Sequence, residues 1–289
     1  MEKEKRLIHL HSFLFENYQG MKKILQADPS LENLYQYTPS IFHSAFGLTP
    51  STSEKLFSYL HTTSIQDILN KINKDETEFI TIYNDAYPYL LKQIYDPPFV
   101  LYLKGKKELL LNHSNIGIIG SRKPSVFADI VCQSIIFDLI RENWTIVSGM
   151  ASGCDTIAHL ETIKASGNTI AVLGSGLLSI YPKENKPLYE KLSSNHLLIS
   201  EYPNWIKPEK RYFPRRNRII AGLSKGILVL EAKEQSGTMI TANFALENGR
   251  EVFAVPGPII IEEYKGCHKL IQEGAKLVTS SNDILEEFI

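Results

Sequence analysis

The chain has 289 residues, 43% of them hydrophobic and 22% charged, which is close to the average of globular proteins and excludes a disordered or collagen-like chain. Its 31 basic and 32 acidic side chains leave a formal charge of −1, so an acidic partner would have to be met by a local cluster of cations. No apolar run is long enough to cross a bilayer, and the N-terminus lacks the apolar run of a signal peptide. We therefore expect a cytoplasmic protein without a membrane partner.

Three cysteines, Cys132, Cys154 and Cys267, lie far apart and form no C-x-x-C pair. Neither a disulfide framework nor a structural metal site is expected from this pattern.

Residues 1–80 are rich in Leu, Ile, Phe and Tyr at helical spacing and poor in glycine, which predicts a small helical domain. Residues 81–112 contain the Pro- and Tyr-rich passage from Tyr87 to Gly105, which we interpret as a connector with one short strand. No internal repeat or low-complexity segment interrupts the chain.

Residues 113–289 alternate short apolar runs with helix-length amphipathic segments. Strands are predicted at residues 116–119, 144–147, 169–173, 197–199, 226–230, 251–255 and 276–279. The helices between them are predicted at residues 127–141, 155–165, 187–192, 217–223, 239–248 and 267–273. This alternation predicts an α/β fold, a Rossmann-like, doubly wound domain with a mainly parallel sheet.

Four glycine loops follow predicted strands, at residues 117–122, 148–155, 173–176 and 231–238. Ligands of open parallel sheets bind at the carboxyl ends of the strands, where glycine turns and helix N-termini offer backbone N–H groups to phosphate. No loop has the dinucleotide fingerprint G-x-G-x-x-G with its acidic residue, and the chain contains no P-loop, so no cofactor is expected.

Several side chains in these loops have two readings. Arg122 follows the first glycine turn and is either a phosphate ligand or a solvated surface residue. Asp155 and His159 share a helix face, where the structural interpretation, a capping carboxylate above a packed histidine, is favoured over an acid–base pair. Glu231 ends a strand before Ser236 and Gly237 and is the carboxylate best placed for chemistry on a nucleotide.

Residues 207–218 carry six cations and one acid, with Tyr202, Trp205, Tyr212 and Phe213 interleaved. A positive groove with aromatic side chains is typical of single-stranded nucleic acid binding. Pro214 indicates the start of a helix whose first turn carries the cations.

The motifs in their order resemble the DNA-processing protein A family, known as DprA or Smf. They are Gly117–Arg122, Ser148–Asp155 with Ala158 and His159, Leu173–Gly176 with Tyr181 and Pro182, Ser200–Pro203, Phe213–Gly222, Ser236–Ala242 and Gly249–Gly257. The resemblance covers residues from about 85 to 280. Relatives often end in a winged-helix domain, which is not expected here, and the segment Gly266–Ala275 departs from the usual family pattern.

The resemblance implies an extended Rossmann fold, a homodimer, and a protein that protects single-stranded DNA and helps load the recombinase RecA during natural transformation. It implies that Arg122 grips the DNA backbone, and that Lys183 and Lys210 contact it as well. Together with the glycine loops and the basic segment, the expected DNA-binding residues are Gly120, Ser121, Arg122, Ser148, Gly149, Gly153, Gly174, Gly176, Lys183, Lys210, Arg211, Phe213, Arg215, Arg216, Asn217, Arg218, Ser236, Gly237 and Thr238. The expected dimer contact is the apolar face of Leu270, Ile271 and Ala275.

Two other classes of function remain open. An enzyme that hydrolyses or transfers the base of a nucleoside monophosphate would use Glu231 with Ser236, Gly237 and Thr238. A RecA-binding adaptor without DNA contact would leave the basic segment unexplained. Of the three classes we expect a protein that binds single-stranded DNA and has no catalytic residue.

Overall fold

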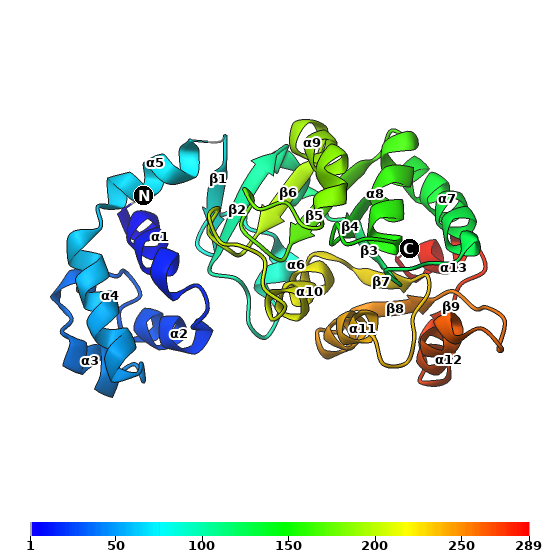
Figure 1. The fold of residues 1–289 in the computed structure, drawn as a ribbon. Helices are drawn as coiled ribbons and strands as arrows, with labels where there is room; N and C mark the ends of the chain where they lie inside the picture. Colours follow the sequence, from blue (N-terminus) through cyan, green and yellow to red (C-terminus); the bar gives the residue numbers. More distant parts are fainter. Residues whose placement is uncertain (1, 75, 289) are drawn as a thin grey trace.

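The computed structural model describes residues 2–74 and 76–288. It begins with a group of short helices packed on one another (Figure 1). Side chains cap four of these helices: Asn17, Thr38, Thr49 and Ser64 each accept a backbone N–H from the first turn. The helices are α1 (Glu2–Leu14), α2 (Tyr18–Ala27), η1 (Leu34–Gln36), α3 (Pro39–Ser44), α4 (Pro50–Thr62) and α5 (Ile65–Asn73).

A nine-stranded sheet follows, in the order β1-β2-β6-β5-β4-β3-β7-β8-β9. β1 pairs with β2 and β2 with β6 in antiparallel fashion, and every other pair is parallel. The strands are β1 (Glu78–Thr81), β2 (Val100–Gly105), β3 (Asn115–Ile119), β4 (Thr145–Ser148), β5 (Asn168–Leu173), β6 (Leu197–Ser200), β7 (Gly226–Val229), β8 (Glu251–Ala254) and β9 (Lys276–Leu277).

Helices cover both faces of the sheet (Figure 1). On one face lie α7 (Val126–Arg141), α8 (Cys154–Lys164) and α9 (Lys186–Asn195), and on the other α10 (Tyr212–Leu223), α11 (Gly237–Glu247) and α12 (Lys265–Gln272). The shorter helices are α6 (Tyr89–Lys92), η2 (Lys107–Leu111), η3 (Lys183–Asn185), η4 (Glu262–Tyr264), α13 (Asn282–Leu285) and η5 (Glu286–Phe288). The inner strands β3, β4, β6 and β7 are buried along their whole length, as a sheet covered on both faces requires.

The predicted fold class is confirmed, including the parallel sheet and the small helical part. The domain division at residues 80 and 112 stays a prediction. β1 spans the first of these boundaries, and β2, within the predicted connector, links β1 to the parallel strands by pairing with β6. None of the helices within residues 2–74 and 76–288 is long and apolar enough to cross a membrane.

The parallel register places the four glycine loops together, along the side of the sheet where the carboxyl ends of the parallel strands lie. Ile119 pairs with Val229, and Ser148 pairs with Ala171, so β3, β4, β5 and β7 all end on the same side of the sheet. The chain leaves each of these strands through one of the four glycine loops.

Candidate nucleic-acid interface

A cavity of about 570 Å³ lies at this edge of the sheet. Its volume is within the range of ligand-binding cavities. It is lined by Ile119, Gly120, Ser121, Arg122, Ala151, Asp155, Tyr181, Lys210, Phe213, Pro214, Arg216, Asn217, Ile220, Ala232, Lys233, Ser236, Gly237, Thr238 and Thr241.

The first glycine loop is held against the second. The backbone N–H of Cys154 donates to the carbonyl of Ser121 at 3.0 Å, at the start of α8. Gly153, with φ of +81°, lies so close that a Cβ there would stand 2.3 Å from the Ser121 carbonyl oxygen. Only glycine allows this approach, and it leaves Arg122 exposed at the mouth of the cavity.

The second loop makes room for a buried arginine. A Cβ on Gly149 would lie 1.3 Å from Nη1 of Arg216, so the guanidinium rests directly on this backbone. Arg216 is 3% exposed, and its Nη1 lies 3.9 Å from Oδ2 of Asp155. Burial lowers the pKa of Arg216, and the Asp155 carboxylate opposes that shift.

The helix α10 carries the central residues of the site. It begins at Tyr212, so Pro214 falls within its first turn. A backbone N–H at this position would have no intrahelical acceptor, so proline, which lacks the N–H, loses no hydrogen bond there. Phe213 lies against Tyr181 with ring centroids 5.2 Å apart, and the Arg122 guanidinium carbon lies 5.9 Å from the Phe213 ring centre. Guanidinium and aromatic groups therefore meet on one wall of the cavity.

The start of α11 also lines the cavity. The hydroxyl of Thr238 donates to the carbonyl of Gly120 at 3.0 Å, which ties the fourth loop to the first. The amide of Asn217 donates to the carbonyl of Gly237 at 3.4 Å and ties α10 to α11. The first N–H groups of an α-helix have no intrahelical acceptor, so this wall presents donors.

The carboxylate proposed for nucleotide chemistry points elsewhere. Glu231 is 0% exposed and does not line the cavity. Its carboxylate accepts hydrogen bonds from the backbone N–H of Ser125 at 2.9 Å, from the hydroxyl of Ser125 and from the hydroxyl of Tyr264 at 2.9 Å. Glu231 thus joins the start of α7 to the segment before α12.

Asp155 and His159 do not form an acid–base pair. His159 is 0% exposed, its Nδ1 lies 2.7 Å from the Thr169 hydroxyl, and burial lowers its pKa to about 3. Asp155 accepts the backbone N–H of Ala151 at 3.3 Å. This arrangement matches the favoured structural interpretation.

Not every cation of the basic segment 207–218 reaches the cavity. Arg218 is 1% exposed, forms ion pairs with Glu201 at 2.6 Å and Asp96 at 3.0 Å, and does not line the cavity. Arg211 is paired with Glu16 and Glu209.

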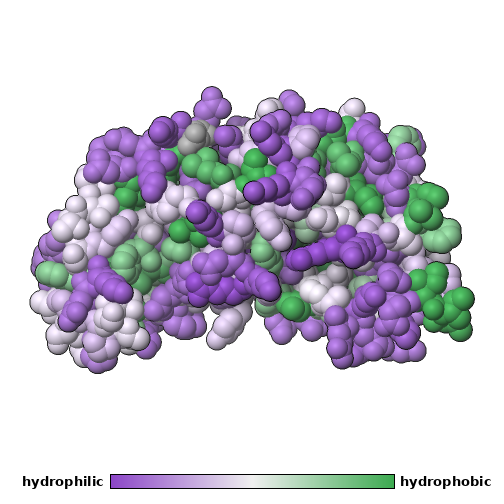
Figure 2. All heavy atoms as spheres, viewed as in Figure 1, coloured by the Kyte–Doolittle hydropathy of each residue, from purple (hydrophilic) through white to green (hydrophobic). Residues whose placement is uncertain are grey.

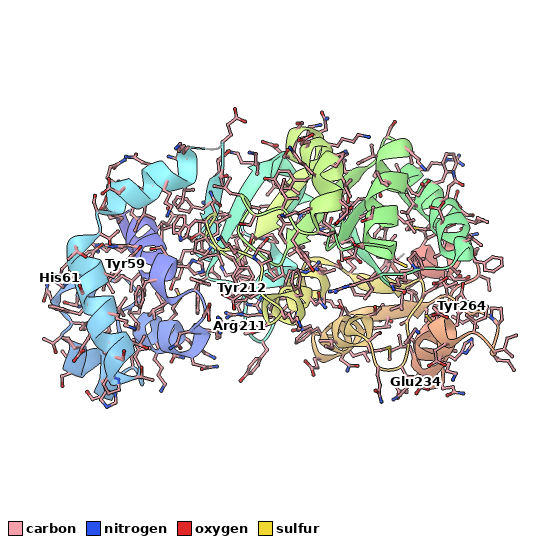
Figure 3. The ribbon with its side chains drawn as sticks, viewed as in Figure 1. Tyr59, His61, Arg211, Tyr212, Glu234 and Tyr264 are labelled. Carbon is pink, nitrogen blue, oxygen red and sulfur yellow. The ribbon has the colours of Figure 1, made fainter. Side chains whose placement is uncertain are left out.

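Arg215 is paired as well, with Glu201 at 3.4 Å, and also donates to the carbonyl of Glu16 at 3.1 Å. Neither Arg211 nor Arg215 lines the cavity. Figure 3 shows Arg211 and Tyr212 where the start of α10 faces the N-terminal helices.

Three of the four aromatic residues in and before this segment do not line the cavity either. Tyr202 and Tyr212 are 0% and 3% exposed, and Trp205 packs against the N-terminal core with Lys71 over its ring. Phe213 alone of the four lines the cavity, because the others fill the space between the helical part and the sheet.

The other expected residues lie close to the cavity or beside it. Ser148 is buried and donates to the carbonyl of Ile118 at 2.6 Å, and Gly176 packs against the carbonyl of Pro203. Gly174 lies against the Phe213 ring. Lys183 is exposed in η3 but does not line the cavity, whereas Lys210 does.

Two contributors were not named by sequence reasoning. Tyr181 was noted only as part of a motif, and Lys233 was not considered, although both line the cavity. Lys233 could have been found from the same principle as the glycine loops, since it lies in the loop that follows β7.

The expected dimer contact stays a prediction, with one of its three residues buried. Leu270 is 1% exposed and packs in the core beneath the sheet, and Ile271 and Ala275 pack against the same core. Exposed apolar side chains occur elsewhere: Val126, Phe127 and Ile130 on α7, and Ile259 and Ile260 before α12. Figure 2 shows apolar surface at the end of the molecule that carries α7 and α12.

A model of the DNA recombination-mediator protein A family matches residues 78–289. The chain is 49% identical to DNA processing protein DprA of Bacillus subtilis over 208 residues, covering 72% of this chain and 70% of the relative. It is 48% identical to DNA processing protein DprA of Streptococcus pneumoniae over 208 residues, covering 72% and 73%.

Solved structures agree. The X-ray structure of DNA processing protein A from Streptococcus pneumoniae has a TM-score of 0.87 and 38% identity, covering 100% of this chain and 99% of that one. A structure of DNA processing protein A from Helicobacter pylori, described for its single-stranded DNA binding mode, has a TM-score of 0.65 and 28% identity, covering 73% and 95%. The chain belongs to the DNA recombination-mediator protein A family.

Proposed function

We propose that this protein binds single-stranded DNA at the strand-end cavity, protects incoming strands and helps to load RecA recombinase onto them in natural transformation. The observation that carries the DNA-binding part is the meeting of Arg122, Lys210 and Arg216 with the rings of Tyr181 and Phe213 in one cavity. Cations neutralise phosphates and aromatic rings stack on bases, and these are the two contacts that single strands offer.

The cavity favours a single strand over a duplex. Its volume of about 570 Å³ admits a nucleotide-sized group but not a base-paired helix. A base reaching the ring of Phe213 must be unstacked from its neighbours, which requires no unpairing energy in a single strand.

The relatives support the same assignment. The Helicobacter pylori protein is described as binding single-stranded DNA, and its fold is similar to that of this chain. The parts of the proposal that concern RecA and natural transformation rest on the family to which the chain belongs.

We propose a binding site without catalysis. The rival nucleotide-processing enzyme needs a carboxylate beside the nucleotide, and Glu231 is held away from the cavity by Ser125 and Tyr264. Asp155 is the carboxylate that does line the cavity, and it is turned toward Ala151 and Arg216.

We also propose a homodimer that uses the C-terminal part of the sheet domain. Leu270 is committed to the core, so the contact would rest on the partly exposed Ile271 and Ala275. Sedimentation at tens of micromolar protein, roughly the range in which mass action favours such dimers, should show a dimer; a monomer there would refute this part.

The test of DNA binding is a salt titration with single-stranded and duplex oligonucleotides of equal length. Affinity for the single strand should be higher and should fall with salt with a logarithmic slope of roughly −0.7 for each phosphate neutralised. Lys210→Glu, inside the cavity, should weaken binding more than Lys183→Glu, outside it. Equal or tighter binding of the duplex would contradict the proposal.

A further inference from the structure

The main cavity opens beside a second, much smaller one of about 50 Å³. The two share Arg122, Ala151, Tyr181, Phe213 and Arg216 in their walls. The smaller cavity is completed by Gly149, Ser152, Gly174 and Pro182. About 10–15 Å³ of such space holds one water molecule, so the smaller cavity has room for a group the size of a phosphate.

Arg216 lies between the two cavities with hydrogen-bonding capacity unused. Its side chain is 4% exposed, and neither Nε nor Nη1 has a hydrogen-bond partner among the described residues. The carboxylate oxygen of Asp155, 3.9 Å from Nη1, is beyond hydrogen-bond distance. A buried donor without an acceptor is costly, and a ligand that brings anionic oxygens into this space would supply the acceptors.

Other positive groups converge on the same space. Arg122 lines both cavities, and the N-terminus of α11, an eleven-residue helix, faces the larger one through Gly237 and Thr238. Among the residues that the structure describes, Asp155 is the one acidic side chain in the lining of the larger cavity, and no acidic side chain lines the smaller. The electrostatic balance favours an anion with more than one charge.

Resting on the proposed function, we propose that the smaller cavity binds a terminal phosphate monoester between Arg122 and Arg216, with the attached nucleoside in the larger cavity. A terminal phosphate monoester carries up to two negative charges, where an internal phosphodiester carries one, so the two arginines favour the terminal group. The ligand class is a nucleoside monophosphate, supplied either by the phosphorylated end of a single strand or by a free mononucleotide.

The experiment compares short fluorescent single strands of one sequence with a 5′-phosphate, a 3′-phosphate or hydroxyl groups at both ends. A strand two nucleotides longer, with hydroxyl ends, controls for the added charge of up to two units. We expect one phosphorylated end to raise affinity about tenfold over the control strand, as one or two charge-assisted hydrogen bonds would. Differences below twofold for both ends would overturn the inference.

A second arm separates the two sources of the phosphate. Thymidine monophosphate, thymidine and inorganic phosphate compete against the phosphorylated strand. Displacement by the monophosphate but not by thymidine identifies free mononucleotides as ligands too, whereas no displacement confines the site to strand ends. Displacement by thymidine as effective as by the monophosphate would overturn the role of the phosphate.

Variants locate the effect. Ser152→Asp places a carboxylate in the wall of the smaller cavity at an exposed loop position, and Ser134→Asp makes the same change on the exposed face of α7. The preference for a phosphorylated end should vanish in the first variant and persist in the second. Arg216→Gln should abolish it as well, and Ser152→Asp keeps the test valid if Arg216→Gln does not fold.

The outcomes distinguish this inference from the proposed function. Single strands that bind regardless of their ends would overturn the inference and leave the function standing. A mononucleotide that binds in a Ser152-sensitive manner, with no binding of longer strands, would support the phosphate site and refute the function.

Discussion

Arg218 and Glu201 form an ion pair in the interior of the protein, with Nη2 and Oε1 2.6 Å apart and each side chain 2% exposed. Asp96 and Arg215 extend the pair into a network of four charges. The network joins α10, the end of β6 and the segment before β2. It therefore fixes the helix that carries Phe213 and Arg216 into the cavity.

Removing one partner of this pair should be strongly destabilising. Arg218→Met leaves Glu201 buried with a weaker partner, and we expect the free energy of unfolding to fall by about 3 kcal/mol or more. Arg211→Met removes two exposed ion pairs near the start of the same helix and should cost less than about 1 kcal/mol. Chemical denaturation of both variants measures the difference; similar losses would show that the network does not hold the helix.

The contact of Arg216 with Gly149 predicts that alanine at position 149 is more harmful than alanine at another glycine of the cavity. Gly149→Ala should displace the guanidinium, lowering stability by about 1–3 kcal/mol and weakening binding of single strands. Gly237→Ala, in the wall of the same cavity, meets no atom within 4 Å and should change stability by less than about 0.5 kcal/mol. Thermal unfolding and strand binding of the two variants test the pair, and a tolerated alanine at 149 would contradict the assigned position of Arg216.

Reversal of charge at the mouth of the cavity should weaken DNA binding without unfolding the protein. Arg122 is exposed, so Arg122→Glu should fold normally while single-strand affinity falls by about tenfold to a hundredfold, as expected for the loss of a charge-assisted contact. Arg141→Glu, at the far end of α7, makes the same change in net charge and serves as the control. Fluorescence anisotropy at fixed salt measures both, and equal affinities would place the DNA elsewhere.

Stability should decrease as the pH falls below about 6.5, the unfolded-state pKa of histidine. Burial lowers the pKa of His9 and His11 to about 4 and that of His159 to about 3. Between these pKa values and pH 6.5, the three histidines bind protons in the unfolded chain but stay neutral in the folded chain. The free energy of unfolding is therefore highest above pH 6.5 and falls progressively toward pH 4. Burial raises the pKa of Asp96 and Asp155, which acts in the opposite sense nearer the carboxyl range.

Urea unfolding between pH 7.5 and 4.5 measures this slope. His11→Asn should make the slope shallower by up to one proton, or about 1.4 kcal/mol per pH unit, whatever its effect on stability at pH 7.5. An unchanged slope in the variant would show that folding does not lower the pKa of His11.

The sequence predicted the sheet well because its strands are buried on both faces and appear as continuous apolar runs. The glycine loops followed from the rule that ligands bind at strand ends, and most of them do border the cavity. Charge was the poorer guide. Arg211, Arg215, Arg216 and Arg218 look alike as a cluster, so composition could not show which of them are buried. Apart from Glu209, the acidic residues near them come from other elements: Glu16, Asp96, Asp155 and Glu201.

The burial of Leu270 could not be predicted from the sequence for a related reason. Apolar residues at helical spacing identify a face of α12, but they do not say whether that face meets the core or another molecule. In the structure Leu270 lies in the core of the same chain, whereas Ile271 and Ala275 remain partly exposed.

The contact between Glu16 and the start of α10 has a practical consequence. Arg211, Tyr212 and Arg215 all bond to this residue of the turn between α1 and α2, and Phe15 packs against Tyr202 and Tyr212. The N-terminal helices thus serve as a brace for the segment that enters the cavity. A shortened protein that begins after α5 would retain the cavity's own residues but lose this support, so its DNA affinity would understate that of the full chain.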